Sequence, residues 1–418
     1  MAICGRTFIN IGQTFMEKSI TTSPNPVLWL LSDTHLLARN LHDYGPAFRR
    51  MEQTTAGKDL AFQEWRLQGL VALAIKKRPT AIIITGDLAF NGEYESAQRL
   101  ADIFAPLEVL GIPLLVVPGN HDIHDGWARS FHQNEMKFAR EISPSDWKNL
   151  LYASYMQAAA QDDSSLAYSV NLNTDYRLLL LDSCLYQPFF NYDDPITNGK
   201  ISKPEQAWLK NQLELAQAAG QHCLVFMHHD LYWHNKLIHR GFVLDNADEI
   251  EPLLAKYEVP AVFAGHIHAQ NILRPDQEHA LAEVATSAFC MTDQGYGQLQ
   301  LTPTSLTYRR QQFAPPEQEF AAYLRSIFFK RDQKQFLAKI DPQTVDPQIW
   351  QEGTKLLAQM HWAYFTGRNL ISPEKLAALQ QTPAFKWLVQ AQIMQPDYLL
   401  SLYHTDPTQN HWYLHLEY

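Results

Sequence analysis

The 418-residue sequence predicts an α/β fold followed by a helical C-terminal region. Three observations lead to this prediction. Up to about residue 270, short continuous apolar runs alternate with longer helix-patterned stretches, which is typical of strands buried on both faces of a sheet. Between about Asp276 and Arg310 the segments are short and alternating, as expected for antiparallel strands that close a second sheet. After Pro315–Pro316, only two of the 18 glycines remain and apolar residues recur at helical spacing.

The strands of the α/β part are too short and too continuously apolar to be helices. They are expected at Val27–Leu31, Ala81–Thr85, Pro113–Val117, Tyr176–Leu181, Cys223–Met227 and Pro260–Ala264. Candidate helices lie between them at Ala61–Lys77, Glu95–Val109 and Lys203–Ala218. Tyr296–Leu301 and Ser305–Tyr308 are expected as antiparallel strands.

The sequence divides into an N-terminal tail (1–26), an α/β domain (27–315) and a helical domain (316–418). In the helical part, Gly367 suits the position just after a helix, and Ser372-Pro373 suits an N-cap followed by proline in the first turn. Its apolar stripe is expected to form core or an oligomer interface rather than a cofactor site, and it could also wall the active cleft. The stripe consists of Phe320, Leu324, Ile327, Phe328, Phe336, Ile340, Trp350, Leu357, Met360 and Tyr364.

Composition excludes several classes of protein. Apolar residues make up 46% of the chain and charged residues 19%, which is ordinary for a protein with a full core and excludes general disorder. The net charge of −10 argues against long nucleic acids as partners. Four scattered cysteines suggest buried thiols rather than a disulfide framework. We find no membrane span or secretory signal, so the cytoplasm is the expected location, and Met16 is an alternative start of the natural chain.

Five of the expected strands end in residues that can bind metals. The residues that follow the strands are Asp33 and His35, Asp87, Asn120 and His121, His228, and the pair His266 and His268. Because ligands of α/β sheets bind outside the carboxyl ends of the strands, these side chains should meet in one crevice. Any one of them alone would be weak evidence, but five strands with the same kind of ending are hard to obtain by chance.

The residue types point to transition metals. Imidazole and carboxylate ligands without thiolates suit Mn, Fe, Zn, Co or Ni. Seven side chains exceed the needs of one ion, so we expect two divalent or trivalent ions, with Mn, Fe or Zn the leading identities and Asp87 the natural bridging ligand. Two such ions lower the pKa of a water that bridges them, and the resulting hydroxide would be a nucleophile for in-line attack at neutral pH.

The same residues resemble the ordered five-block signature of the calcineurin-like metallophosphoesterases. The blocks are Asp33-x-His35, Gly86-Asp87, Gly119-Asn120-His121-Asp122, His228 and Gly265-His266-x-His268. The resemblance implies a two-sheet sandwich flanked by helices with a dinuclear centre at the strand ends. It also implies roles for the residues: Asp33, His35 and His268 at one metal, Asn120, His228 and His266 at the other, Asp87 between them, and His121 as a catalytic histidine that is not a ligand.

Two positions need a choice. His228 and His229 are adjacent, and only one can face the metals because successive strand residues point to opposite faces; we choose His228.

In the protein-phosphatase branch the Gly-Asp block continues with an Asp and an Arg, where this chain has Phe90 and Asn91. Without that Arg a phosphate dianion loses its best partner, which favours singly charged diesters. The chain therefore resembles the bacterial class III cyclic-nucleotide phosphodiesterases that carry a helical C-terminal domain.

Other site residues are less well defined. His121 is the candidate general acid for the leaving alkoxide, or only a hydrogen-bond donor to phosphate. Asp122 could orient His121 or cap the following turn. The segment from His229 to Asn235 is expected as a loop at the rim of the site, with His234 as a substrate contact, and Asn91 is a second candidate contact.

The leading hypothesis is a dinuclear-metal phosphodiesterase that acts on small anionic diesters, with cyclic nucleotides as the leading class, with no membrane partner and with homo-oligomerisation through the helical domain. The alternatives are a broad phosphomonoesterase or a pyrophosphate-cleaving hydrolase, a nuclease, and a non-catalytic binding scaffold. A scaffold would typically have lost ligands, whereas all seven positions are filled here.

Overall fold

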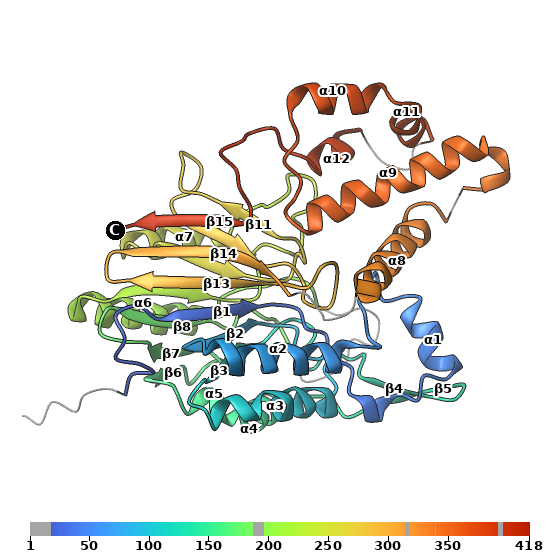
Figure 1. The fold of residues 1–418 in the computed structure, drawn as a ribbon. Coiled ribbons are helices and arrows are strands. Elements are labelled where there is room, and N and C mark those ends of the chain that lie inside the picture. Colours follow the sequence, from blue (N-terminus) through green and yellow to red (C-terminus); the bar gives the residue numbers. More distant parts are fainter. Residues whose placement is uncertain (1–17, 187–195, 314–317, 339, 392–395) are drawn as a thin grey trace, which may run out of the picture.

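The computed structural model describes residues 18–186, 196–313, 318–338, 340–391 and 396–418. Two large sheets face each other and carry helices on their outer sides, with further helices gathered at one end (Figure 1). A separate two-stranded sheet pairs β4 (Arg129–His132) with β5 (Glu135–Phe138). The predicted fold class, a two-sheet sandwich flanked by helices with a helical C-terminal part, is confirmed.

The first sheet has six strands and a parallel half. In spatial order they are β15 (Tyr413–Glu417), β14 (Ser305–Gln312), β13 (Gly295–Thr302), β1 (Val27–Leu31), β2 (Ala81–Thr85) and β3 (Leu114–Val117). β1, β2 and β3 run parallel, so their carboxyl ends lie at one edge. β13 runs antiparallel to β1, with Leu28 opposite Leu299.

The second sheet has seven strands. In order they are β11 (Asn271–Leu273), β12 (Ala282–Ala285), β10 (Ala261–Ala264), β9 (His222–Phe226), β8 (Tyr176–Leu180), β7 (Tyr168–Asn171) and β6 (Ala160–Gln161). The central strands β8, β9, β10 and β12 are parallel and buried on both faces, as continuous apolar runs predict.

Side-chain alternation along the second sheet builds two apolar layers. In β9, Leu224 and Phe226 pack toward the first sheet, whereas Val225 belongs to the layer beneath the outer helices. The outer helices of this sheet are α6 (Lys203–Ala219) and α7 (Ala247–Lys256). The other sheet is covered by α2 (Gln63–Lys77) and α3 (Tyr94–Glu108), and α1 (Pro46–Glu52), α4 (Pro144–Leu150) and α5 (Tyr152–Tyr155) complete this part. Two short 3₁₀ turns lie at Arg39–Leu41 and Pro342–Thr344.

The C-terminal helices form their own core against the strand ends. They are α8 (Gln318–Gln335), α9 (Pro347–Phe365), α10 (Pro373–Gln381), α11 (Pro383–Gln390) and α12 (Pro396–Ser401). Leu357, Met360 and Tyr364 are buried in one cluster that also contains Ile267, between the two histidines after β10. The predicted apolar stripe of α9 is thus core. Gly367 adopts the left-handed conformation expected after a helix, and Ser372 caps α10.

Two parts of the topology differ from the sequence prediction. The region from 276 to 310 does not close a sheet of its own: β13 and β14 extend the sheet of β1, while β12 runs parallel to β10. The chain also returns to the first sheet after the helices, where β15 pairs antiparallel with β14. The structure contains three buried free thiols, Cys184, Cys223 and Cys290, in agreement with the sequence, and Cys4 lies outside the described residues. In the described ranges, no helix combines the length and the apolar character that crossing a bilayer requires.

Candidate metal centre

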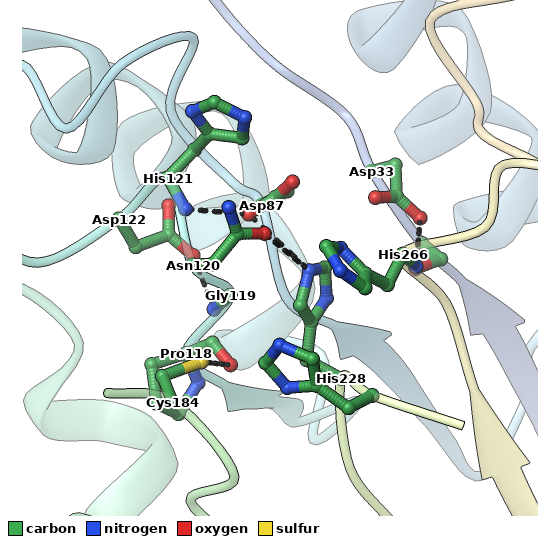
Figure 2. Close-up of polar contacts among 12 residues, drawn as sticks. Asp33, Asp87, Pro118, Gly119, Asn120, His121, Asp122, Cys184, His228 and His266 are labelled. Carbon is green, nitrogen blue, oxygen red and sulfur yellow. Dashed lines mark hydrogen bonds and ion pairs between the residues drawn. The ribbon is translucent and has the colours of Figure 1, made fainter. Parts of the chain in front are cut away.

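The carboxyl ends of five strands meet in one place. β1, β2 and β3 contribute from the first sheet, and β9 and β10 contribute from the second (Figure 2). The backbone turns sharply just after these strands, and five of the predicted site residues have positive φ between 40° and 60°. These residues are Asp33, His35, Asp87, His266 and His268. Such conformations cost free energy in residues other than glycine and cluster at functional sites.

One group of side chains joins β1, β2 and β10. His268 Nε2 lies 3.2 Å from Asp33 Oδ1, and His35 Nε2 lies 3.3 Å from Asp87 Oδ2. The Nε2 atoms of His35 and His268 are themselves 3.3 Å apart. Two carboxylates and two imidazoles therefore point at one small volume, which matches the first predicted set of ligands together with Asp87.

A second group shares Asp87 with the first. Oδ1 of Asp87 lies 3.5 Å from Nε2 of His228, which in turn lies 3.1 Å from Oδ1 of Asn120. His266 completes the group, and its backbone N–H donates to Asp33 Oδ2 over 3.1 Å. Asp87 thus presents one oxygen to each group, as a bridging carboxylate would (Figure 2).

The chemistry of these groups fits bound cations. Asp33 Oδ1 and Asp87 Oδ2 are buried and have no hydrogen-bond partner among the described residues, which is costly for a carboxylate unless a cation compensates. Two ligand atoms that each lie about 2.1 Å from a tetrahedral ion are about 3.4 Å apart. The observed separations of 3.2–3.5 Å agree with that spacing.

Backbone carbonyls orient two of the imidazoles, and burial favours the neutral form of His266 and His35. Nδ1 of His228 donates to the Thr85 carbonyl over 2.8 Å, and Nε2 of His266 donates to the Gly241 carbonyl over 2.8 Å, which leaves the other nitrogen of each ring for a metal. Burial lowers the pKa of His266 to about 3, helped by the charge of His228, and burial likewise lowers the pKa of His35 well below its usual value. The neutral imidazole is the form that binds metals.

His228 and His229 face opposite ways. The ring of His229 is held between the Ser183 hydroxyl, 2.8 Å from Nδ1, and the Thr197 carbonyl, 3.0 Å from Nε2. Nε2 of His228 faces Asp87 within the second group, whereas both nitrogens of His229 contact residues outside the two groups, so the geometry favours His228.

Glycines allow the strand ends to approach this closely. A Cβ on Gly119 would overlap the backbone nitrogen of Asp87, and one on Gly86 would overlap the His228 ring. Gly86 also has a φ of 90°, a conformation that side chains disfavour. The glycines of the Gly-Asp and Gly-Asn-His blocks are therefore needed to bring the ligands of the two sheets together.

His121 lies beside the two groups and is held by a residue that the sequence analysis missed. Its Nδ1 lies 3.1 Å from Oδ1 of Asp125, whose side chain is fully buried, while the His121 ring is 19% exposed. Burial alone would lower the pKa of His121, but the negative charges of Asp87 and Asp125 outweigh it and raise the pKa. Asp122 is not the orienting residue, because its carboxylate accepts hydrogen bonds from the backbone N–H groups of Ala89 and Gly119.

The two predicted substrate contacts have different surroundings. Asn91 is buried at the end of the loop after Asp87, and its backbone N–H donates to the carboxylate of Glu93. His234 is not on an exposed rim: its side chain has no exposed surface and lies 3.2 Å from Glu283. The expectation of an exposed rim position for His234 is therefore corrected, while a contact with substrate stays a prediction. The sequence could not show this because the partner, Glu283, is 49 positions away.

A lysine near the site was also missed. The Lys58 ammonium lies 5.9 Å from the centre of the Phe90 ring, and its charge contributes to the lowered pKa of His35. Phe90 occupies a position where the phosphatase branch carries a polar residue. Lys58 belongs to the segment between α1 and α2, far from any of the motifs, so no local pattern could have identified it.

A sequence model of the calcineurin-like phosphoesterase family matches residues 26–270, more than half of the chain. A probable cyclic nucleotide phosphodiesterase of Vesicomyosocius okutanii is 24% identical over 45% of this chain and 61% of its own length. A glycerophosphodiester phosphodiesterase of Enterobacter lignolyticus is 26% identical over 57% of this chain and 69% of its own length. The chain thus spans only about two thirds of the length of these relatives.

A dimetal phosphatase from Danio rerio has a similar fold. Its crystal structure superposes with a TM-score of 0.50 over 69% of this chain and 96% of its own, at 13% sequence identity. At this identity the likeness concerns the fold alone.

Proposed function

Because the chain belongs to the calcineurin-like phosphoesterase family, we propose that it hydrolyses small anionic phosphodiesters, with cyclic nucleotides as the leading substrate class. The observation that carries this proposal is the convergence of two ligand groups on the shared carboxylate of Asp87. The two relatives compared above are both named as phosphodiesterases, which agrees with it.

In this proposal Asp33, His35 and His268 hold one ion and Asn120, His228 and His266 hold the other, with Asp87 shared. When bound, such ions neutralise phosphate charge and supply a water-derived nucleophile at neutral pH. Their identity, with Mn, Fe or Zn as candidates, follows from the imidazole and carboxylate donors.

His121 supplies the proton for the leaving alkoxide. Its Nδ1 is engaged by Asp125, so Nε2 is the atom that would face the substrate. The hydrogen bond to a buried carboxylate also fixes the orientation of the ring.

The preference for diesters rests on the residues after Asp87. With Phe90 and Asn91 in place of the acidic and basic residues of the phosphatase branch, the loop offers no bidentate cation to a phosphate dianion. Asn91 remains a candidate contact for a phosphate oxygen.

The proposal is tested by the hydrolysis of bis(p-nitrophenyl) phosphate and p-nitrophenyl phosphate by protein reconstituted with Mn²⁺. We expect kcat/KM to be at least about tenfold higher for the diester, and then turnover of 2′,3′- or 3′,5′-cyclic nucleotides. The Asp87→Asn variant in the same assay reports contaminating phosphatase. Faster cleavage of the monoester would contradict the substrate class.

Lys58 is the one observation that favours the alternative, a phosphomonoesterase or pyrophosphatase, because an ammonium beside Phe90 offers charge to a dianion. Replacing Lys58 by alanine is expected to raise KM about five- to tenfold, ~1 kcal/mol for a partly exposed charge pair, with a larger effect on the monoester than on the diester. Lys58→Arg should retain the wild-type KM. Lys137→Ala, which removes an exposed lysine paired with Glu135, is the matched control. An unchanged KM for both substrates would remove Lys58 from the site.

Homo-oligomerisation through the C-terminal helices stays a prediction. The apolar side chains of α9 are buried in the helical core, so fewer of them remain for such an interface than the sequence suggested. Light scattering on the purified full chain measures it directly.

A further inference from the structure

A third cluster of potential metal ligands lies outside the centre described above. Asp230 and His234 follow β9, and Glu283 belongs to β12, the strand next to β10. All three residues are buried, and the side chains are at most 1% exposed. One imidazole and two carboxylates are thus enclosed between the end of one strand and the middle of another.

The geometry of this cluster repeats that of the dinuclear groups. His234 Nε2 lies 3.2 Å from Glu283 Oε2 and 3.7 Å from Asp230 Oδ1. In the main centre, the three shortest separations between imidazole nitrogen and carboxylate oxygen are 3.2–3.5 Å, and the one between His35 Nε2 and Asp33 Oδ1 is 4.0 Å. The distances in both clusters lie near the separation of about 3.4 Å that a tetrahedral ion imposes on its ligand atoms.

Hydrogen bonds do not explain the cluster. Neither carboxylate oxygen of Asp230 and neither ring nitrogen of His234 has a hydrogen-bond partner among the described residues. Leaving such groups buried and unpaired costs free energy of the order of several kcal/mol for a charge. Glu283, by contrast, accepts from the backbone N–H groups of Leu231 (2.6 Å) and Tyr232 (2.8 Å), which fixes its carboxylate. This arrangement is typical of a metal ligand that is held in place from behind.

We propose that Asp230, His234 and Glu283 bind a third divalent transition-metal ion, of the zinc type, that is separate from the dinuclear centre. One imidazole and two carboxylates are a suitable donor set for such an ion. The ion would bind one ring nitrogen of His234 and a carboxylate oxygen of Asp230, atoms that have no hydrogen-bond partner among the described residues. The proposal concerns metal binding alone and does not depend on the reaction.

The position of the ion indicates a structural role. It would tie the segment that begins with His228 to β12, and so brace a ligand of the main centre from outside the crevice. The same segment contacts the C-terminal helices, where Asn235 donates to the Ser401 hydroxyl over 3.1 Å. A cavity of about 1030 Å³ lies between this segment and the helices, and it is lined by Trp233, Arg274 and His404 among others.

Counting metals tests the proposal. Metal-free protein is reconstituted with Zn²⁺, desalted and analysed by inductively coupled plasma mass spectrometry. We expect three ions per wild-type chain, two in Asp230→Asn and two in His234→Gln. Asp87→Asn should keep at least one ion, and the double variant Asp87→Asn/Asp230→Asn should lose it. The matched control is Asp276→Asn, which alters an exposed Asp–His pair without a third ligand and should keep all three ions.

Thermal unfolding separates loss of the ion from misfolding. Without metal, Asp230→Asn removes an unpaired buried carboxylate, so its Tm should equal or exceed that of metal-free wild type. With Zn²⁺ the order should reverse, because only the wild type gains the binding free energy of the third ion. A wild-type count of two, or a count that Asp230→Asn and His234→Gln leave unchanged, would overturn the proposal. Hydrolytic activity plays no part in this readout, so failure here is distinct from failure of the proposed function.

Discussion

Replacing Asp87 by asparagine is expected to reduce kcat/KM for a phosphodiester by about 10³-fold or more, which corresponds to the several kcal/mol that metal ions contribute to phosphoryl chemistry. Asp87 is the only residue that appears in both groups of the proposed centre among the described residues, with Oδ2 near His35 and Oδ1 near His228. An amide has no negative charge to hold two cations together. The measurements are steady-state kinetics and the metal content of the same preparation.

The effect of Asp87 must be separated from a general loss of structure. Asp87 also accepts the backbone N–H of His121 over 2.9 Å, a bond that the amide oxygen of asparagine can keep. Asp175→Asn is the control, because Asp175 precedes β8 and lies at the opposite end of the parallel strands. Activity within tenfold of wild type, with full metal content, would contradict a bridging role for Asp87.

Replacing His121 by alanine is expected to lower kcat by about 10²–10⁴-fold, the usual contribution of general acid catalysis, and to leave the metal content unchanged. Asp125→Ala should have a smaller effect, because it removes only the group that orients the ring. Since Asp125 acts through His121, the double variant should be no slower than His121→Ala alone.

Asp122→Ala distinguishes the two neighbouring carboxylates. Asp122 accepts from two backbone N–H groups, so its loss should lower the Tm, whereas Asp125→Ala should mainly lower kcat. A fall in metal content in His121→Ala would make His121 a ligand, and a multiplicative effect in the double variant would show that Asp125 acts independently.

Much of the fold was predictable because the strands are buried on both faces. The six predicted strands of the α/β part agree with β1, β2, β3, β8, β9 and β10 to within one residue at each end. Continuous apolar runs of this kind identify buried strands from the sequence alone. β12 and β15 were missed, because β12 contains the buried charge of Glu283 and β15 alternates polar and apolar residues within a region that otherwise has helical periodicity.

The residues of the candidate site were likewise predictable only in part. Ligands placed directly after strands were predictable, since the carboxyl ends of parallel strands meet at one edge of each sheet. Residues in long connecting segments were not. Asp125 lies in a turn with no periodicity, and Lys58 precedes α2, yet both act on His121 or His35 through space.

The sequence by itself determined which residues could reach the centre, because polar residues directly follow five of the predicted strands. Only the tertiary structure decided which of them face one another. It turned His228 inward and His229 outward, and it assigned Asp125 rather than Asp122 to His121. It also buried His234 against Glu283. The physical reason is that the two sheets are stacked by side-chain packing, and this packing, not local sequence, sets the distances between their strand ends.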